Sequence, residues 1–282
     1  MVLPCYRAAP VALHSVRELE RALSRAGIRE WEIIVVDDGG ADFPPDFPEP
    51  NGRVTLLRLP RNRGKGAAVK AGMRRSRGRA RIYTDADLPY GASIVAALAE
   101  FLLRTGPDLV IGDRSLPFSS HPRPAPLRRR ALSRACSIAV GALLFRGFPD
   151  TQCGLKGLRG EVADRLCPLL RTDRFAFDIE LLYVAHCHGL EIRRVPVRLR
   201  RNVTHSVRPV RDSLRAALDL LLILWRRSRG RYASRALRAL AAAPPAEAAS
   251  GGWRPARDPS RVRGSIEPGV AHERGAPPRG TG

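Results

Sequence analysis

Residues 33–40 read Ile-Ile-Val-Val-Asp-Asp-Gly-Gly, an apolar run that ends in two carboxylates and two glycines. Four consecutive β-branched residues favour a strand that is buried on both faces, as in a parallel sheet. Residues 82–87 repeat the arrangement with Ile-Tyr-Thr-Asp-Ala-Asp. Because ligands of parallel α/β sheets bind at the carboxyl ends of the strands, both acidic segments are candidate functional positions.

Further strand-like runs on both sides of this segment alternate with helical patterns. The expected strands are 2–3, 33–36, 54–59, 82–84, 109–111 and 191–197, and the expected helices lie near 11–26, 65–76, 91–104 and 178–188. This alternation is typical of βαβ units, so the sequence predicts an α/β domain with a largely parallel sheet that ends near residue 197.

Composition limits the classes of partner and compartment. The 282 residues carry 49 Lys and Arg against 27 Asp and Glu, and the net charge of +22 favours polyanionic partners. A hydrophobic content of 44% allows a sizeable core and excludes a wholly disordered chain. The five cysteines are scattered without a C-x-x-C pair, which argues against a disulfide framework or a zinc site and favours a reducing compartment. Since no apolar stretch reaches roughly 18 residues, we expect a chain that neither spans a membrane nor is exported.

Two segments combine basic residues with helical patterns. Residues 127–145 are expected to form a helix with four arginines near its start, following a proline-rich loop. Cations there oppose the helix dipole, so an anion docked on this turn and a solvated helix end are both open interpretations. Residues 214–225 have apolar side chains at helical spacing, with arginines on either side. This amphipathic helix can lie in a membrane interface or pack on the domain's own core.

Charged motifs carry the predicted chemistry. Asp85 and Asp87 are one residue apart at a strand end, so they point the same way and together suit a hard divalent cation; an ordinary strand-to-helix connection is the alternative. Residues 62–66 read Asn-Arg-Gly-Lys-Gly and place cations at a helix start, where unpaired N–H groups attract phosphate. Neither a Walker A loop nor G-x-G-x-x-G after the first strand is present, which excludes those two nucleotide-binding motifs.

Together these motifs resemble glycosyltransferase family 2, and within it the dolichyl-phosphate or polyprenyl-phosphate hexose synthases. The resemblance covers about residues 2–225. The matching segments, in family order, are Pro4-Cys5-Tyr6, Val35-Val36-Asp37-Asp38-Gly39, Gly64-Lys65-Gly66-Ala67-Ala68-Val69, Tyr83-Thr84-Asp85-Ala86-Asp87-Leu88, Ile111-Gly112-Asp113-Arg114, Asp150-Thr151-Gln152-Cys153-Gly154-Leu155-Lys156, Phe177-Asp178-Ile179-Glu180-Leu181-Leu182, Val195-Pro196-Val197 and Val207-Arg208-Pro209-Val210-Arg211-Asp212. Arg7-Ala8 stands where the family usually has Asn-Glu, and Ser206 replaces a basic residue for which Arg208 is the expected substitute.

The resemblance implies a GT-A fold, which is a Rossmann-like nucleotide-sugar-binding α/β fold with a mostly parallel mixed sheet and a divalent metal, Mg²⁺ or Mn²⁺. The expected organisation is a catalytic domain over 1–212, basic amphipathic interface helices over 213–238 and a disordered Pro/Gly/Arg-rich tail over 239–282.

The implied activity is an inverting transfer of a hexose from a nucleotide sugar, UDP-glucose or GDP-mannose, to a dolichyl or polyprenyl phosphate. The implied location is the cytoplasmic face of a membrane, with peripheral attachment. One alternative is a family member that acts on another glycan or glycolipid. Alternatives of other classes are a basic nucleic-acid-binding protein, which the scarcity of aromatic residues among the arginines disfavours, and a non-catalytic membrane adaptor.

The resemblance also implies roles for single residues. Asp87 is the expected direct metal ligand, Asp85 serves metal and ribose beside it, and Arg114 acts on the acceptor phosphate. Pro4, Tyr6 and Asp38 are expected at the nucleobase and ribose, and Asp37, Lys65 and Arg208 are expected to bind the substrates. One of Arg129 and Arg130, together with Ser133, is expected at the acceptor phosphate. Gln152 and Lys156 are expected beside the sugar or the acceptor.

Three of the acidic and basic residues also have a structural interpretation. Lys156 precedes a predicted strand, and a tight turn with a solvated Lys is the alternative to a substrate role. Asp178 and Glu180 are expected to be structural, because acidic residues in a helix's first turn favour the dipole and Asp is a good N-cap.

Overall fold

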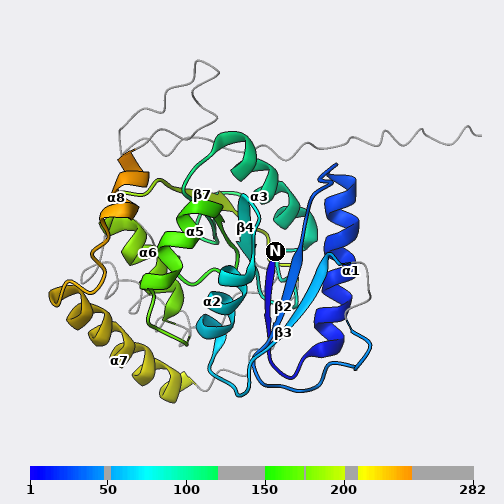
Figure 1. Cartoon of the computed structure of the whole chain (residues 1–282), viewed down its shortest axis with the longest axis horizontal. Helices are drawn as coiled ribbons and strands as arrows, with labels where there is room; N and C mark the ends of the chain where they lie inside the picture. The colour runs from blue at the N-terminus through cyan, green and yellow to red at the C-terminus, as the bar shows by residue number, and fades with distance from the viewer. Residues whose placement is uncertain (48–51, 120–149, 175, 201–208, 243–282) are drawn as a thin grey trace, which may run out of the picture.

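The computed structural model describes residues 1–47, 52–119, 150–174, 176–200 and 209–242 (Figure 1). These residues form a seven-stranded sheet with the order β3-β2-β1-β4-β6-β5-β7. The strands are β1 (Val2–Cys5), β2 (Ile33–Asp37), β3 (Val54–Arg58), β4 (Ala80–Tyr83), β5 (Leu109–Asp113), β6 (Lys156–Arg159) and β7 (Ile192–Pro196). Only the two pairings of β6 within this sheet are antiparallel, so the prediction of a mostly parallel mixed sheet is confirmed.

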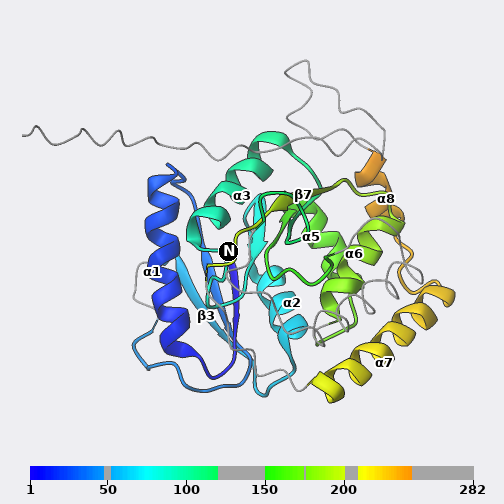
Figure 2. The same cartoon turned by 180° about the vertical axis from the view of Figure 1, so that it is seen from behind.

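Helices cover both faces of the sheet (Figures 1 and 2). They are α1 (Ala9–Arg25), α2 (Lys65–Arg75), α3 (Ala92–Thr105), α5 (Gly160–Leu166), α6 (Phe177–Cys187), α7 (Pro209–Ser228) and α8 (Arg235–Ala242), with a short 3-10 helix over Cys167–Leu169. Helices α1 and α3 pack on one face, and α2, α5 and α6 pack on the other, where parts of α7 and α8 join them.

The apolar run of β2 follows from this layering. Ile34 and Val36 belong to the core cluster on the α2 and α6 side, whereas Ile33 and Val35 belong to the cluster under α1 and α3. Successive side chains of a strand point to opposite faces, so a strand covered on both sides is apolar at every position. The strand ends with Asp37, which is also buried.

The direction of β6 and the helix that follows it were not predicted. The sequence indicates a strand after Lys156, and β6 begins on that residue, between β4 and β5 and antiparallel to both. Local sequence carries no signal for the direction of a strand, because direction depends on the neighbours in the sheet. Helix α5 has seven residues, too few to establish a period of 3.6.

Helix α7 packs on the domain through one side and exposes large apolar residues on another. Ile223 is fully buried in the core, so packing on the domain's own core is confirmed for this residue. Four side chains remain 45–60% exposed, and these are Leu218, Leu221, Leu222 and Trp225. Their contact with a membrane stays a prediction. Among the described residues no helix is long and apolar enough to cross a membrane.

Glu180 connects α6 to the segment that follows α7. Its carboxylate is fully buried and accepts hydrogen bonds from the Tyr232 hydroxyl at 2.6 Å and from Arg226 Nη1 at 3.2 Å. The other carboxylate oxygen accepts the backbone N–H groups of Arg171 and Thr172. Glu180 is structural, as expected, but it binds distant segments and not the start of its own helix.

Some predictions fall on residues outside the described ranges. These are the helix over 127–145, the expected tail beyond residue 242, and the site residues Arg129, Arg130, Ser133 and Arg208. The expectation of a disordered tail is wrong for residues 239–242, because they form the end of α8. The predicted domain boundary at residue 212 falls inside α7, and the division into domains stays a prediction.

Candidate active site

The charged site residues gather at the edge where the parallel strands end. Asp85 and Asp87 follow β4, and Arg114 follows β5. The antiparallel β6 begins at this same edge, since Lys156 pairs in register with Tyr83, the last residue of β4. Ligands of α/β sheets bind at this edge, so the structure brings the predicted residues to the expected place.

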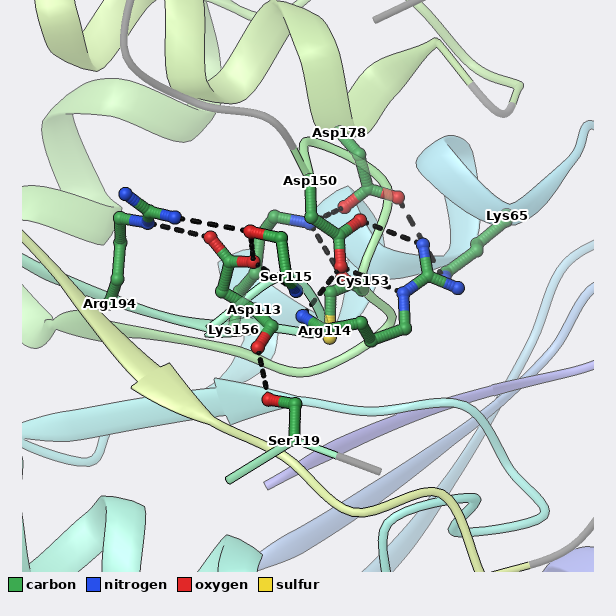
Figure 3. Close-up of polar contacts among 10 residues, drawn as sticks. All are labelled: Lys65, Asp113, Arg114, Ser115, Ser119, Asp150, Cys153, Lys156, Asp178 and Arg194. Carbon is green, nitrogen blue, oxygen red and sulfur yellow. Dashed lines mark hydrogen bonds and ion pairs between the residues drawn. The ribbon is translucent and has the colours of Figure 1, made fainter. Parts of the chain in front are cut away.

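Four side chains of alternating charge, Asp85, Lys65, Asp178 and Lys156, form what we call the charge chain. The Lys65 ammonium at the start of α2 is 2.6 Å from Asp85 Oδ1 and 3.9 Å from Asp178 Oδ2. The other oxygen of Asp178 accepts a hydrogen bond from Lys156 Nζ at 2.6 Å (Figure 3). It also accepts one from the Tyr83 hydroxyl at 2.6 Å. The exposed fraction falls from 33% at Asp85 through 17% at Lys65 to 4% at Asp178 and zero at Lys156. The charge chain therefore leads from the accessible edge into the core.

The inner members of the charge chain keep their charges. Burial by itself raises the pKa of Asp178, but the ammonium groups of Lys156 and Lys65 outweigh it and hold this pKa below its usual value. Burial likewise lowers the pKa of Lys65, and the carboxylates of Asp85 and Asp178 overcome that effect and raise it. Both groups are therefore ionised at neutral pH.

The predicted capping role of Asp178 is wrong. Ala176 is the N-cap residue of α6, and no side chain caps this helix end. Asp178 turns instead toward Tyr83 and Lys156. The solvated alternative for Lys156 is also wrong, because its ammonium is buried on Asp178 and on the carbonyl of Cys153 at 2.7 Å. A direct contact of Lys156 with substrate stays a prediction. Gln152, four residues earlier, is exposed, and its contact with substrate also stays a prediction.

The residues at the outer end of the charge chain fit a divalent metal ion. Asp85 and Asp87 are both partly exposed. Gly154 leaves the space that the Asp85 carboxylate fills, because a Cβ there would collide with Oδ2 of Asp85. The described residues contain no group of three or more His, Cys, Asp or Glu that could hold a metal by themselves. Two carboxylates with an open side suit Mg²⁺ or Mn²⁺ when substrate phosphates supply further ligands.

Arg114 is fixed by a bidentate ion pair on the same edge. Its Nε and Nη2 each lie 2.7 Å from a carboxylate oxygen of Asp150 (Figure 3). Burial raises the pKa of Asp150, but Arg114 outweighs this effect and lowers it. These bonds use two of the five N–H donors of the guanidinium, and the Arg114 side chain is 37% exposed. Arg114 is therefore oriented and accessible to an anion.

Asp150 and Asp178 are the partners that sequence reasoning missed. Both lie in segments that carry the family resemblance, and that position is the signal that could have identified them. A neighbouring carboxylate, Asp113, is fully buried and accepts hydrogen bonds from Ser115 and from Arg194 Nε at 2.6 Å. These bonds hold the turn that presents Arg114.

The residues predicted at the nucleoside lie at the ends of the first two strands. Pro4 is in β1, and Tyr6 follows it with 43% of its surface exposed and the Arg7 guanidinium 5.3 Å from its ring centre. An exposed ring at this edge is able to stack on a nucleobase. The roles of Pro4 and Tyr6 in binding stay predictions.

Asp37 and Asp38 are buried and bind the backbone. Asp37 accepts the N–H groups of residues 40 and 41. Asp38 accepts the N–H groups of Arg63 and Gly64 at 2.9 and 2.7 Å. The segment before α2 thus binds an internal carboxylate with two of the N–H groups that the sequence assigned to phosphate, and for these two groups that prediction is wrong. Contacts of Asp37 and Asp38 with substrate stay predictions.

Comparison with known proteins gives the family. The model described as "Glycosyl transferase family 2" matches residues 1–166. The chain belongs to this family. A Dictyostelium discoideum protein named dolichyl-phosphate beta-glucosyltransferase is 33% identical to this family 2 chain over an alignment of 209 residues, and the match covers 70% of this chain and 63% of that protein. A Mus musculus protein of the same name is 31% identical over an alignment of 256 residues, and the match covers 83% of this chain and 79% of the mouse protein.

A solved structure agrees with the fold of this family 2 glycosyltransferase. Glucosyl-3-phosphoglycerate synthase from Mycobacterium tuberculosis, in complex with Mn²⁺, UDP-glucose and glycerol 3-phosphate, has a TM-score of 0.54 and 18% identity, covering 80% of this chain and 78% of that chain. The predicted GT-A fold is confirmed, and so is the family resemblance.

Proposed function

We propose that this family 2 chain transfers glucose, with inversion, from UDP-glucose to a dolichyl or polyprenyl phosphate, with Mg²⁺ or Mn²⁺ at Asp85 and Asp87. The observation that carries the proposal is the placement of this carboxylate pair and the fixed Arg114 on one edge of the sheet. The names of the Dictyostelium and mouse relatives support the sugar and the acceptor. The mycobacterial complex, which contains Mn²⁺ and UDP-glucose, supports the donor and the metal.

The side chains of this edge account for the chemistry. Asp87 and Asp85 would hold the metal, which when bound neutralises the negative charge of the departing diphosphate. Arg114, held by Asp150, would bind and orient the acceptor phosphate with its remaining donors. A phosphate oxygen is already anionic at neutral pH, so no side chain has to remove a proton from the attacking atom. Arg114 on Asp150, and Lys156 on the buried Asp178, are held in place before substrate binds, which lowers the cost of reorganisation in the transition state.

A donor screen tests the proposal. The purified protein is incubated with UDP-glucose or GDP-mannose, with Mn²⁺ or Mg²⁺, and with or without a short polyprenyl phosphate, and released nucleoside diphosphate is measured. We expect UDP release that requires both the metal and the lipid phosphate. Release of GDP from GDP-mannose would show that the transferred sugar is mannose and not glucose. Equal turnover on a soluble sugar or a glycolipid would support the alternative acceptor. No turnover with any donor would overturn the proposal.

We also propose that the enzyme is attached peripherally to the cytoplasmic face of a membrane through α7. Its exposed residues Leu218, Leu221, Leu222 and Trp225 follow the spacing i, i+3, i+4 and i+7, so they share one face of the helix. Three exposed arginines at positions 227, 229 and 231 come directly after this face, whereas Arg226 is bonded to the buried Glu180. An apolar face beside cations suits anionic lipid head groups, and the cytoplasmic leaflet carries the negative surface potential. The apolar face is not a feature that a nucleic acid backbone would bind.

The double variant Leu221→Glu, Leu222→Glu is expected to lose binding to anionic lipid vesicles by at least about tenfold, because each buried Leu contributes roughly 1.5–3 kcal/mol. Co-sedimentation with phosphatidylglycerol-containing vesicles measures the partition coefficient. The matched control is Val11→Glu, which changes a 43% exposed apolar residue on α1. Equal sedimentation of the double variant and the control would contradict attachment through α7.

A further inference from the structure

The Lys65 ammonium sits on the carboxylate where the proposed metal would bind. Its Nζ is 2.6 Å from Asp85 Oδ1, within reach of a charge-assisted hydrogen bond. A divalent cation on the same carboxylate would be close to this ammonium, and like charges at such a distance repel strongly in a partly buried site. Lys65 and a metal ion therefore compete for Asp85.

A second carboxylate lies within reach of the same ammonium. Asp178 Oδ2 is 3.9 Å from Lys65 Nζ, while Asp178 Oδ1 is occupied by Lys156 and the Tyr83 hydroxyl. The stem of a lysine has four rotatable bonds, so rotation about them can carry the ammonium from Asp85 to Asp178. Asp178 itself has no such freedom, because its side chain is 4% exposed and bonded on its far side.

We propose that Lys65 is an internal counter-ion that occupies Asp85 in the free protein and moves onto Asp178 when a metal ion binds together with the nucleotide. This inference rests on the proposed metal role of Asp85 and Asp87. Asp178 is a positioning residue in this scheme, since it acts through Lys65. A nucleoside diphosphate adds negative charge that attracts both cations, so the nucleotide favours metal binding and, by linkage, the metal favours nucleotide binding to the same extent.

The consequence is an order of binding. Without nucleotide the metal must displace an ammonium from Asp85, and the protein holds it weakly. With nucleotide the displaced ammonium has two anions beside it, Asp178 and the diphosphate. Lys65 thus neutralises Asp85 until the donor binds, and the metal and the donor bind together.

Manganese binding to the full chain tests the inference without an activity assay. Free Mn²⁺ is titrated by electron paramagnetic resonance, with and without UDP, for the wild type and for Lys65→Met. In the absence of UDP we expect Lys65→Met to bind Mn²⁺ about tenfold more tightly than the wild type, because the competing ammonium is gone. The ratio of Mn²⁺ affinities with and without UDP should shrink in this variant. Lys65→Arg should restore weak binding.

Two further variants separate competition from a general change in charge. Lys70→Met removes another ammonium from the same helix, one that pairs with Asp173 at 2.7 Å, and should leave the Mn²⁺ affinity unchanged. Asp178→Asn removes the second position for Lys65, so it should weaken Mn²⁺ binding several-fold in the wild-type background and much less in the Lys65→Met background. Urea unfolding of each variant confirms that it is folded before titration.

The outcomes distinguish this inference from the proposed function. If the wild type binds Mn²⁺ in the presence of UDP but Lys65→Met leaves the affinity without UDP unchanged, the counter-ion role of Lys65 is overturned and the proposed function stands. An equal effect of Asp178→Asn in both backgrounds overturns the role of Asp178 in the same way. If the wild type binds no Mn²⁺ even with UDP, the proposed metal role fails and this inference fails with it.

Discussion

The variant Asp87→Asn is expected to lose turnover by about a thousandfold or more, since a catalytic metal contributes several kcal/mol to the transition state. Asparagine keeps the shape of the side chain but removes the charge that would hold the cation. Asp87 is partly exposed at the edge of the sheet. The measurement is the rate of UDP release at saturating UDP-glucose and polyprenyl phosphate, with Mn²⁺ over a range of concentrations.

The matched control for this prediction is Asp46→Asn, because Asp46 is an exposed carboxylate that lies outside the site. We expect this control to keep the wild-type rate and both variants to keep the wild-type circular dichroism spectrum. An unimpaired Asp87→Asn would remove Asp87 from the proposed metal site. Partial rescue by a tenfold higher Mn²⁺ concentration would support the metal role further.

The variant Lys156→Met is expected to lower the free energy of unfolding by about 3 kcal/mol, because removing one partner of a buried ion pair leaves an uncompensated charge. Lys156 is fully buried, and its ammonium is 2.6 Å from Asp178 Oδ1. Methionine fills most of the space of the lysine stem but offers no donor to Asp178 or to the Cys153 carbonyl. Urea unfolding followed by tryptophan fluorescence measures the change.

The pH dependence of this stability loss tests whether the unpaired carboxylate of Asp178 causes it. In the wild type the pKa of Asp178 is held below its usual value, so this group stabilises the fold above that value and its contribution is lost as the pH falls through the folded-state pKa. Removing Lys156 takes away the largest of the interactions that oppose the effect of burial, so the pKa of Asp178 rises in the variant and this pH-dependent stabilisation becomes smaller. The difference between variant and wild type should therefore narrow from pH 7 toward pH 3. A difference that is constant with pH would assign the loss to packing.

The parallel strands could be predicted because their signal is local. A strand covered on both faces is apolar at every position, and the 33–36 run of the sequence meets this condition without knowledge of its neighbours. The position of β6 within the sheet could not be read in this way. Its residues Lys156 to Arg159 include two cations and a glycine, and they form a strand because β4 and β5 pair with it on both sides.

The site was also predictable only where its signals are local in the sequence. Asp85, Asp87 and Lys65 were placed at one edge because each follows or begins an element whose direction the pattern gives. The partnership of Lys156 with Asp178 was missed, because both residue types are usually exposed and rules for helix ends describe only local contacts. Asp38 shows the same limit: its two N–H partners are 25 and 26 residues away in the chain.

Helix α6 carries Asp178 toward the site and, two residues later, Glu180 toward Tyr232 and Arg226. Both carboxylates are buried and bonded on several sides, so this turn of helix does not bend without breaking strong contacts. If α7 rests on lipid as proposed, this rigid connection fixes the distance between the membrane surface and the site where the phosphate reacts. An acceptor is then selected by how far its head group rises from the membrane as well as by its chemistry.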